Sequence, residues 1–324
     1  MNMPRRYLYI PTSFLIWMQW MLFIITTAAT SFAGDNGGRA GSFLRLGLGP
    51  RARAMGDAYT ALADNVYAPY YNPAGLPLIA QPEVAVSTGI LSFDRQFTSA
   101  GFAKFLPPKA GFGINILRSG FGESDVRDAD GNATGEHIED TQYTVMFGFA
   151  LRFGEKFSAG IAPQWIHTQI YDVTASSVGL NIGALYQYSP VWSFGVSLKN
   201  LLQKLQYSRN ATGLGDETTV DKLPATLRLG VAHHHSLNEN FSMVASYDLE
   251  KTSDYTLAHH MGAEIGWQNK FFLRTGLDQY DWTAGLGIPF DTFGKKLIVD
   301  YTVILDGRKG ISTVSHDMGL YVRF

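Results

Sequence analysis

Residues 241–250 read Phe-Ser-Met-Val-Ala-Ser-Tyr-Asp-Leu-Glu, and apolar or aromatic side chains take every second position. The alternating set is Phe241, Met243, Ala245, Tyr247 and Leu249. Successive side chains of a β-strand point to opposite faces, so a period of two predicts a strand with one apolar face. The other face carries small or polar residues. This stretch therefore predicts a strand that contacts an apolar phase on one side.

The same period recurs from residue 83 to the end, and no segment with a helical period competes with it there. Several segments exceed the about 5 to 6 residues usual in soluble strands and suit the roughly 9 to 11 residues of a membrane-spanning strand. An even number of antiparallel strands can close on itself. We therefore expect an all-β fold, a transmembrane antiparallel β-barrel of about fourteen strands. The candidate strands begin near Glu83, Phe97, Gly111, Thr141, Phe157, Ser176, Trp192, Ala225, Phe241, Thr256, Phe271, Trp282, Lys296 and Ser315.

Composition excludes several other classes of protein. The chain has 324 residues, a formal net charge of -2, 17% charged residues and no Cys. The low charge argues against a disordered chain and against nucleic-acid binding. The absence of Cys excludes disulfides, Cys-based zinc sites, iron–sulfur clusters and thiol catalysis. The mean hydropathy of -0.03 excludes a bundle of membrane helices, but it is compatible with strands that alternate between lipid and water.

The first 33 residues have the organisation of a secretory signal peptide. Arg5 and Arg6 precede an apolar stretch over residues 14–25, and small residues mark a cleavage site that ends at Ala33. An uncleaved membrane anchor is the alternative, which the polar, Gly-rich residues 34–41 disfavour. The predicted division of the chain is therefore 1–33 signal peptide, 34–81 N-terminal hatch or plug, and 82–324 barrel.

The lengths of the connections predict an orientation. If the mature N-terminus starts inside the cell envelope, the even-numbered connections are periplasmic turns, and all of them are short. They are residues 107–109, 154–156, 189–191, 236–240, 268–270 and 291–295. The two long insertions, residues 120–140 and 202–223, fall in odd-numbered connections and are expected as extracellular loops. This segregation is typical of bacterial outer-membrane barrels and disfavours a soluble periplasmic β-sandwich or propeller.

The last predicted strand ends on an aromatic residue. Met318, Leu320, Val322 and Phe324 share one face, and the chain stops at Phe324. This end resembles the signal that outer-membrane barrels present to their assembly machinery. Together with the signal peptide, it predicts location in the bacterial cell outer membrane, with outer-membrane lipid and the β-barrel assembly machinery as partners.

The segment before the barrel, residues 34–81, lacks the period of two. The Ala-rich residues 52–63 predict a small helix. The sequence Asn-Pro-Ala-Gly at 72–75 has turn chemistry, because proline fixes its own φ and glycine adopts conformations that other residues resist. A barrel of about fourteen strands leaves a cavity unless something fills it. We therefore expect this segment to fold inside the lumen as a short hatch.

The hatch also carries a recognisable motif, with Arg-x-x-x-Met-Gly-Asp at 51–57 and Asn-Pro-Ala-Gly-Leu at 72–76. This pattern is similar to the N-terminal region of the PorV/PorQ family, within the FadL-like group of fourteen-stranded barrels. Two positions depart from the family pattern: Ala54 stands where Gly is frequent, and Asn65 where a second acidic residue is common. The predicted motif residues are Arg51, Arg53, Met55, Gly56, Asp57, Asp64, Asn72, Pro73, Ala74, Gly75 and Leu76.

This resemblance implies functions that spacing alone does not give. PorV-type members are non-enzymatic accessories of type IX secretion, so the implied role is to bind or hand on exported proteins, with secreted proteins or secretion components as partners. The alternative is a FadL-like transporter, which passes hydrophobic molecules by means of a hatch and a lateral opening and has a hydrophobic ligand as its partner. We expect no cofactor in either case.

Charged residues of both signs are expected inside the barrel, where they can pair with charges on the hatch. These residues are Arg152, Lys199, Arg228, Asp248, Glu250, Glu264, Arg274, Asp278, Asp300, Asp317 and Arg323. Inward glycines either leave room for something to approach the wall or only relieve crowding, and the sequence does not decide between the two. They are Gly148, Gly160, Gly179, Gly183, Gly195, Gly262, Gly266, Gly285 and Gly287.

Other features resemble metal or catalytic sites without the required pattern. Histidines at 233–235 and 259–260 lie on strands that the ninth strand separates, too far apart to share one ion. Residues 128–139 have calcium-loop spacing, but Ala133 replaces the required Gly. The chain has no phosphate loop and no nucleophile elbow, and no spacing pairs His167 with a serine. We therefore expect no metal site, no catalytic residue and no enzyme.

Overall fold

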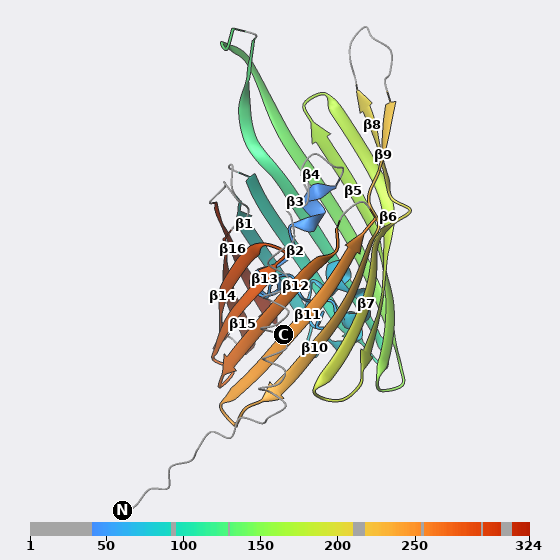
Figure 1. Cartoon of the computed structure of the whole chain (residues 1–324), viewed down its shortest axis with the longest axis vertical. Coiled ribbons are helices and arrows are strands. Elements are labelled where there is room, and N and C mark those ends of the chain that lie inside the picture. The colour runs from blue at the N-terminus through green and yellow to red at the C-terminus, as the bar shows by residue number, and fades with distance from the viewer. Residues whose placement is uncertain are drawn as a thin grey trace, which may run out of the picture. The chain divides into compact units, whose positions relative to one another are not determined.

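The computed structural model describes residues 41–91, 95–128, 130–209, 218–253, 256–292, 294–305 and 313–324. The predicted signal peptide, residues 1–33, and the first residues of the predicted hatch lie outside these ranges. Within them, antiparallel strands surround a short helical segment (Figure 1).

The strands form one closed antiparallel sheet. Consecutive strands pair from β1 to β7 and from β10 to β16, and β7 pairs with β10. β1 pairs with both β2 and β16, so the first and last strands meet. In chain order the strands are β1 (Glu83–Ile90), β2 (Arg95–Leu106), β3 (Ala110–Arg127), β4 (Ala133–Phe153), β5 (Phe157–Ile170), β6 (Val173–Gln187), β7 (Trp192–Leu201), β8 (Lys204–Arg209), β9 (Thr218–Lys222), β10 (Thr226–Ser236), β11 (Phe241–Thr252), β12 (Ala258–Trp267), β13 (Phe271–Asp278), β14 (Asp281–Thr292), β15 (Lys295–Leu305) and β16 (Val314–Arg323).

The barrel itself has fourteen strands, as the sequence predicts. The short strands β8 and β9 pair with each other and continue the β7–β10 pair beyond a break near Leu202. The predicted starts agree with the observed ones to within a few residues, except that β4 begins at Ala133 rather than near Thr141.

Burial alternates along the strands because lipid-facing and lumen-facing side chains alternate. On β16, Met318 and Leu320 are exposed on the outside, whereas Asp317 and Tyr321 are buried inside. Exposed large apolar residues are otherwise unfavourable, so a continuous outer band of them marks the lipid-facing surface. The outer band and the inner polar face follow the period of two in the sequence.

The connections at the two ends differ in length, as predicted, but both long ones contain strand in their described residues. Short turns join β2 to β3, β4 to β5 and β12 to β13 at one end, which we call the turn end. At the opposite end, the hairpin end, residues 120–140 are mostly strand, because β3 and β4 extend to 18 and 21 residues. Likewise β8 and β9 account for part of 202–223. These hairpins stand above the other strands in Figure 1.

The helical elements of the hatch are short: η1 (Ser42–Arg45), α2 (Pro50–Ala54), α3 (Ala68–Tyr71) and η2 (Pro73–Leu78). The expected helix over residues 52–63 is wrong, because α2 ends at Ala54. Gly56 and Asp57 have φ of 59° and 60°, a left-handed conformation that breaks the helix. None of the helices in the described ranges is long and apolar enough to cross a membrane.

Candidate functional site: a hatch tied to the barrel wall

The hatch fills the lumen closely because wall glycines admit its backbone. Six of the predicted inward glycines lie so near the hatch that an added Cβ would touch it. Gly195, for example, faces the backbone of Thr60 and Ala61. We call these six the glycine socket: Gly148, Gly160, Gly183, Gly195, Gly262 and Gly285. For them the structure favours close approach over simple relief of crowding.

The other three predicted glycines face wall side chains instead of the hatch. Gly179 lies against Gln203, Gly266 against Ser242 and Phe272, and Gly287 against Arg274 and Asp300. The sequence gives no signal that separates these glycines from the socket, because both groups occupy inward positions on strands.

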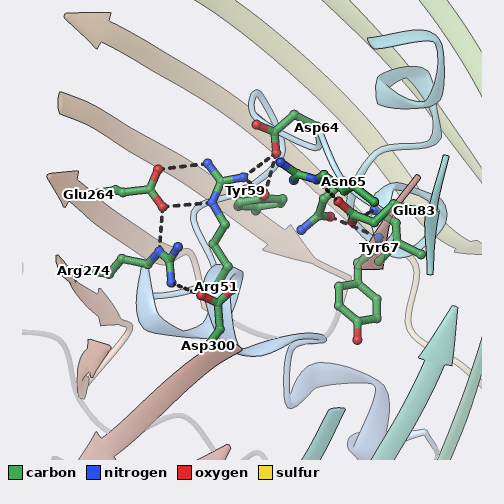
Figure 2. A network of polar contacts seen from close by, with 11 residues as sticks. Arg51, Tyr59, Asp64, Asn65, Tyr67, Glu83, Glu264, Arg274 and Asp300 are labelled. Carbon is green, nitrogen blue, oxygen red and sulfur yellow. Dashed lines mark hydrogen bonds and ion pairs between the residues drawn. The ribbon is translucent and has the colours of Figure 1, made fainter. Parts of the chain in front are cut away.

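Arg51 stands at the centre of a charged network between the hatch and the wall (Figure 2). Its guanidinium donates to both oxygens of Glu264 on β12, at 2.9 and 3.0 Å, and to Asp64 of the hatch at 2.8 Å. Arg274 donates to Glu264 at 2.6 Å and to Asp300 at 2.7 Å. Two parallel hydrogen bonds fix orientation as well as charge, so this pair sets the angle of α2 against the wall.

The remaining hatch charges have different partners. Arg53 pairs with Asp317 of β16 at 3.2 Å, and both side chains are almost fully buried. Asp57 has no ion pair among the described residues, but its Oδ1 accepts a hydrogen bond from Tyr71 at 2.6 Å. Asp64 pairs within the hatch, with Arg51. Of the four hatch charges, Arg51 and Arg53 therefore pair with carboxylates of the wall, whereas Asp57 and Asp64 have partners within the hatch.

Wall side chains also hold the hatch backbone directly through hydrogen bonds. The carboxylate of Asp248 accepts from the N–H groups of Tyr59 and Thr60 at 3.0 and 2.9 Å. Hydroxyl and amide groups donate to hatch carbonyls in the pairs Ser158–Ala74, Ser193–Ala61, Thr283–Ala54, Thr302–Pro50 and Asn115–Val66. Buried carbonyl groups need such partners, so each bond fixes a point of the hatch.

Asn72 joins the hatch to itself and to β6. Its Oδ1 accepts from the N–H of Ala74 at 3.1 Å, which caps η2, and its Nδ2 donates to the carbonyls of Thr60 and Ala184. Gly75 is required by contact rather than by a special φ, because a Cβ there would overlap the carbonyl of Ala63. The expected conformational role of this glycine is therefore wrong.

The other motif residues pack against the wall. Met55 and Leu76 are fully buried. Pro73 lies against Gly160, and Gly56, whose N–H donates to Thr283 at 3.2 Å, lies against the backbone of β12 and β13. Phe324 is outside the lumen: its N–H donates to the carbonyl of Pro82 at 3.1 Å, beside the β1–β16 junction, and its ring is exposed.

The wall has a break where β6 changes its partner from β7 to β8. Residues 173–176 of β6 pair with β8, and residues 180–187 pair with β7. Residues 177–179 between them have no strand partner on this side in the described chain. Asn200 and Leu202 have φ of 58° and 61°, which turns the chain out of the ladder. The break interrupts the backbone hydrogen bonds that otherwise close the barrel.

Four side-chain amides close this break, and we call them the amide seal: Gln164, Asn181, Asn200 and Gln203. Gln164 donates to Gln203 at 2.9 Å and accepts from Asn181 at 3.2 Å. Gln203 is buried, and its Nε2 has no hydrogen-bond partner. Side-chain hydrogen bonds therefore replace the backbone ladder here. The sequence analysis missed this site because polar residues are expected at every inward position of a barrel strand.

Apolar side chains line the inner wall beside the amide seal. They belong to one buried cluster that includes Phe43 and Leu44 of η1. Ile166 is the cross-strand partner of Ser177, and Leu205 lies on β8 just past the break. The wall members of this cluster on β3 to β6 and on β8 include Leu117, Met146, Ile166, Ala175 and Leu205.

Three solved structures share this architecture. The CymD monoaromatic hydrocarbon channel matches with a TM-score of 0.58 at 12% identity, over 86% of this chain and 97% of that one. The toluene transporter TodX of Pseudomonas putida matches with 0.58 at 13%, over 85% and 97%. A FadL homologue of Pseudomonas aeruginosa matches with 0.52 at 10%, over 82% and 95%. The fold is FadL-like.

The fold places this chain in the bacterial outer membrane, as the sequence predicts. No protein-family model matches the chain, and no curated protein matches it either. The structural neighbours are transport channels rather than enzymes, which agrees with the expectation of a non-enzymatic protein.

The described residues contain no group of three or more His, Asp or Glu side chains that could hold a metal ion. His259 faces outward and is hydrogen-bonded to Tyr247 at 2.7 Å, whereas His260 faces the lumen. The carboxylate of Asp128 accepts from the backbone N–H groups of Asp130 and Asn132, so the exposed turn uses it for its own structure.

Proposed function

We propose that this chain is a channel that admits small hydrophobic molecules through the outer membrane and releases them sideways through the break at the amide seal. The break carries the proposal, because side-chain hydrogen bonds replace the backbone ladder there, beside an apolar lining. The FadL-like fold and the hydrocarbon channels among the neighbours support transport more than they support the secretion role implied by the hatch motif.

The packed hatch also favours a lateral route. The hatch backbone touches the glycine socket on several strands, so a straight path from end to end requires many contacts to break. We expect the path from the hairpin end to the break to require movement of η1 and of the amide seal, and to leave the contacts of the glycine socket in place. Since Phe43 and Leu44 occupy the apolar cluster beside the seal, an entering hydrophobic molecule competes with them.

A removable covalent lock tests the route. A Cβ built on Gly179 lies 2.8 Å from that of Gln203, closer than the about 3.5 to 4.5 Å that a disulfide spans, so the chain at residue 203, between β7 and β8, has to shift outward by about 1 Å to form the bond. The chain has no native Cys. In cells that express Gly179→Cys with Gln203→Cys, oxidation should abolish uptake of radiolabelled toluene, and reduction should restore it.

The matched control places a disulfide where the wall is continuous. Ser87 and Ser99 face each other across β1 and β2, with their hydroxyl oxygens 2.7 Å apart. Oxidised Ser87→Cys with Ser99→Cys should leave toluene uptake unchanged. Uptake that continues through the oxidised Gly179–Gln203 lock would refute the lateral route, and no uptake by the unmodified chain would refute transport of this substrate class.

A second candidate function is the accessory role in type IX secretion. The observation that favours it is the long β3–β4 hairpin. Its last pairing with β2 is between Phe121 and Arg95, so the hairpin beyond Phe121 extends past β2, and the first residues of β4 are exposed on both faces. Such a ribbon offers area to a protein partner. Removing residues 126–134 should then reduce co-purification of exported proteins while toluene uptake persists, and equal co-purification would exclude this role for the hairpin.

A further inference from the structure

Three ionisable side chains lie side by side on the inner wall, on adjacent strands. Asp248 of β11 is the register partner of His260 of β12, and His260 is the register partner of Asp278 of β13. Asp248 and His260 are buried, whereas the side chain of Asp278 is 27% exposed. We call Asp248, His260 and Asp278 the acid–histidine row.

His260 lies between carboxylates without a settled hydrogen bond. Its Nδ1 is 2.8 Å from Oδ1 of Asp278, and its Nε2 is 3.7 Å from Oε2 of Glu250. Neither nitrogen is aligned for a hydrogen bond in the structure. Buried polar atoms without partners are costly, so the arrangement depends on charge attraction between the ring and the two acids.

The middle of the hatch rests on the groups around this row. One carboxylate oxygen of Asp248 accepts hydrogen bonds from the N–H groups of Tyr59 and Thr60. Arg228 of β10 donates to the carbonyl of Asp57 at 3.0 Å and also pairs with Glu250. A change of charge at His260 therefore acts on the same residues that fix the hatch segment 57–60.

The charges around His260 balance only when it carries a proton. Four carboxylates, two arginines and Lys199 gather here, so with Lys199 charged a neutral His260 leaves one negative charge unmatched, and a neutral Lys199 would leave a second. The acids are Asp57, Asp248, Glu250 and Asp278, and the bases are Arg45, Lys199 and Arg228. Histidine is the side chain that exchanges its proton near neutral pH. Partly exposed Asp278, next to the β13–β14 turn at the hairpin end, gives that proton access to water.

We infer that His260 is a proton-dependent latch: its protonated ring holds hatch segment 57–60 on the wall, and loss of the proton releases the segment. The inference adds regulation to the proposed channel, and it rests on that function only for its biological purpose. Opening of the hatch is measured with ions and needs no hydrophobic substrate.

Asp57 acts in the same direction and has to be separated from His260. Burial, and then the nearby Asp278, raise the pKa of Asp57, while Arg228 and the hydrogen bond from Tyr71 lower it in part. A carboxyl group with a raised pKa stabilises the folded hatch below its unfolded pKa, and this contribution is lost as pH rises through the folded pKa. Both groups therefore loosen the hatch as pH rises, so both are varied in the test.

The experiment records single-channel openings of the purified protein in planar bilayers at about pH 6 and about pH 9. For the unmodified chain we expect openings to rise about tenfold at the higher pH, the effect of about 1.4 kcal/mol. His260→Gln should open as often at the lower pH as the unmodified chain does at the higher one. Asp278→Asn removes the unmatched charge and should stay closed at both. The control is His259→Gln, which changes the lipid-facing neighbour and should keep the normal response.

Three outcomes would overturn the latch. They are a normal pH response in His260→Gln, an open Asp278→Asn channel at the higher pH, and loss of the pH response in the single variant Asp57→Asn. Heat-resistant migration in gels checks that each barrel is folded. If His260→Gln does not fold, Asp278→Asn still decides the question. A normal ion response without toluene uptake would refute the proposed transport and leave the latch standing.

Discussion

The side-chain oxygen of Asn72 occupies the space that a Cβ atom on Gly183 would take. The same side chain caps η2 through Ala74 and donates to the carbonyls of Thr60 and Ala184. One amide therefore ends a helix, joins two parts of the hatch and fixes both to β6. Asn72 can occupy this position only because Gly183 has no side chain.

Gly183→Ala should displace the hatch and leave the strand pairing of the barrel intact. The added methyl group overlaps Asn72, so the hatch must move or lose its cap, at a cost of about 1 to 3 kcal/mol for overpacking. We expect faster protease cleavage within residues 57–76 and unchanged heat-resistant migration in gels. Gly266→Ala is the control, because its new Cβ meets only Ser242 and Phe272 of the wall. Equal cleavage in both variants would contradict this role for Gly183.

The barrel could be predicted from the sequence because its physics is local. A lipid-facing side chain alternates with a lumen-facing one along each strand, so residues 241–250 already show which face meets lipid. Short turns are also local, and residues 154–156 and 268–270 lie where expected. The long insertion at 120–140 was harder, because a ribbon exposed on both faces has no apolar period to distinguish it from a loop.

The contacts of the hatch could not be predicted, because they join residues far apart in the chain. Arg53 and Asp317 are 264 positions apart, and only closure of the barrel brings them together. The partner of Asp57 is a tyrosine hydroxyl, although its charge suggested a cation. Gln203 carries no sequence signal either, since its role follows from a break in strand pairing. Such features depend on the register of several strands at once.

Asp317→Asn should weaken the attachment of α2 to the wall. The change leaves the buried guanidinium of Arg53 without its carboxylate, which costs about 3 to 5 kcal/mol in comparable buried pairs. Hydrogen exchange of the amides in residues 50–58 should accelerate accordingly. Adding Arg53→Met removes the unmatched charge and should restore most of the protection. Equal exchange in the single and double variants would show that the pair does not hold the hatch.

The hairpin end should face the outside of the cell. Cysteines placed one at a time at Asn132, in the β3–β4 turn, and at Asn269, in the short β12–β13 turn, report the two ends without competition from native thiols. An impermeant maleimide on intact cells should label the first and not the second, and disrupted cells should label both. Labelling of the second alone on intact cells would reverse the orientation and place the opening of the proposed channel in the periplasm.

Deleting residues 45–76 should convert the closed barrel into an open one. These residues contain α2, α3 and the turn that enters η2, and they contribute several of the largest fully buried side chains: Leu48, Met55, Tyr59, Tyr67, Tyr71 and Leu76. Without them, a fourteen-strand wall encloses a water-filled space, so the ion conductance in a planar bilayer should rise several-fold. The freed wall charges Glu264 and Asp317 would then lack their hatch arginines and should favour cations over anions. A folded deletion variant with the low conductance of the intact chain would show that the wall itself, and not the hatch, closes the lumen.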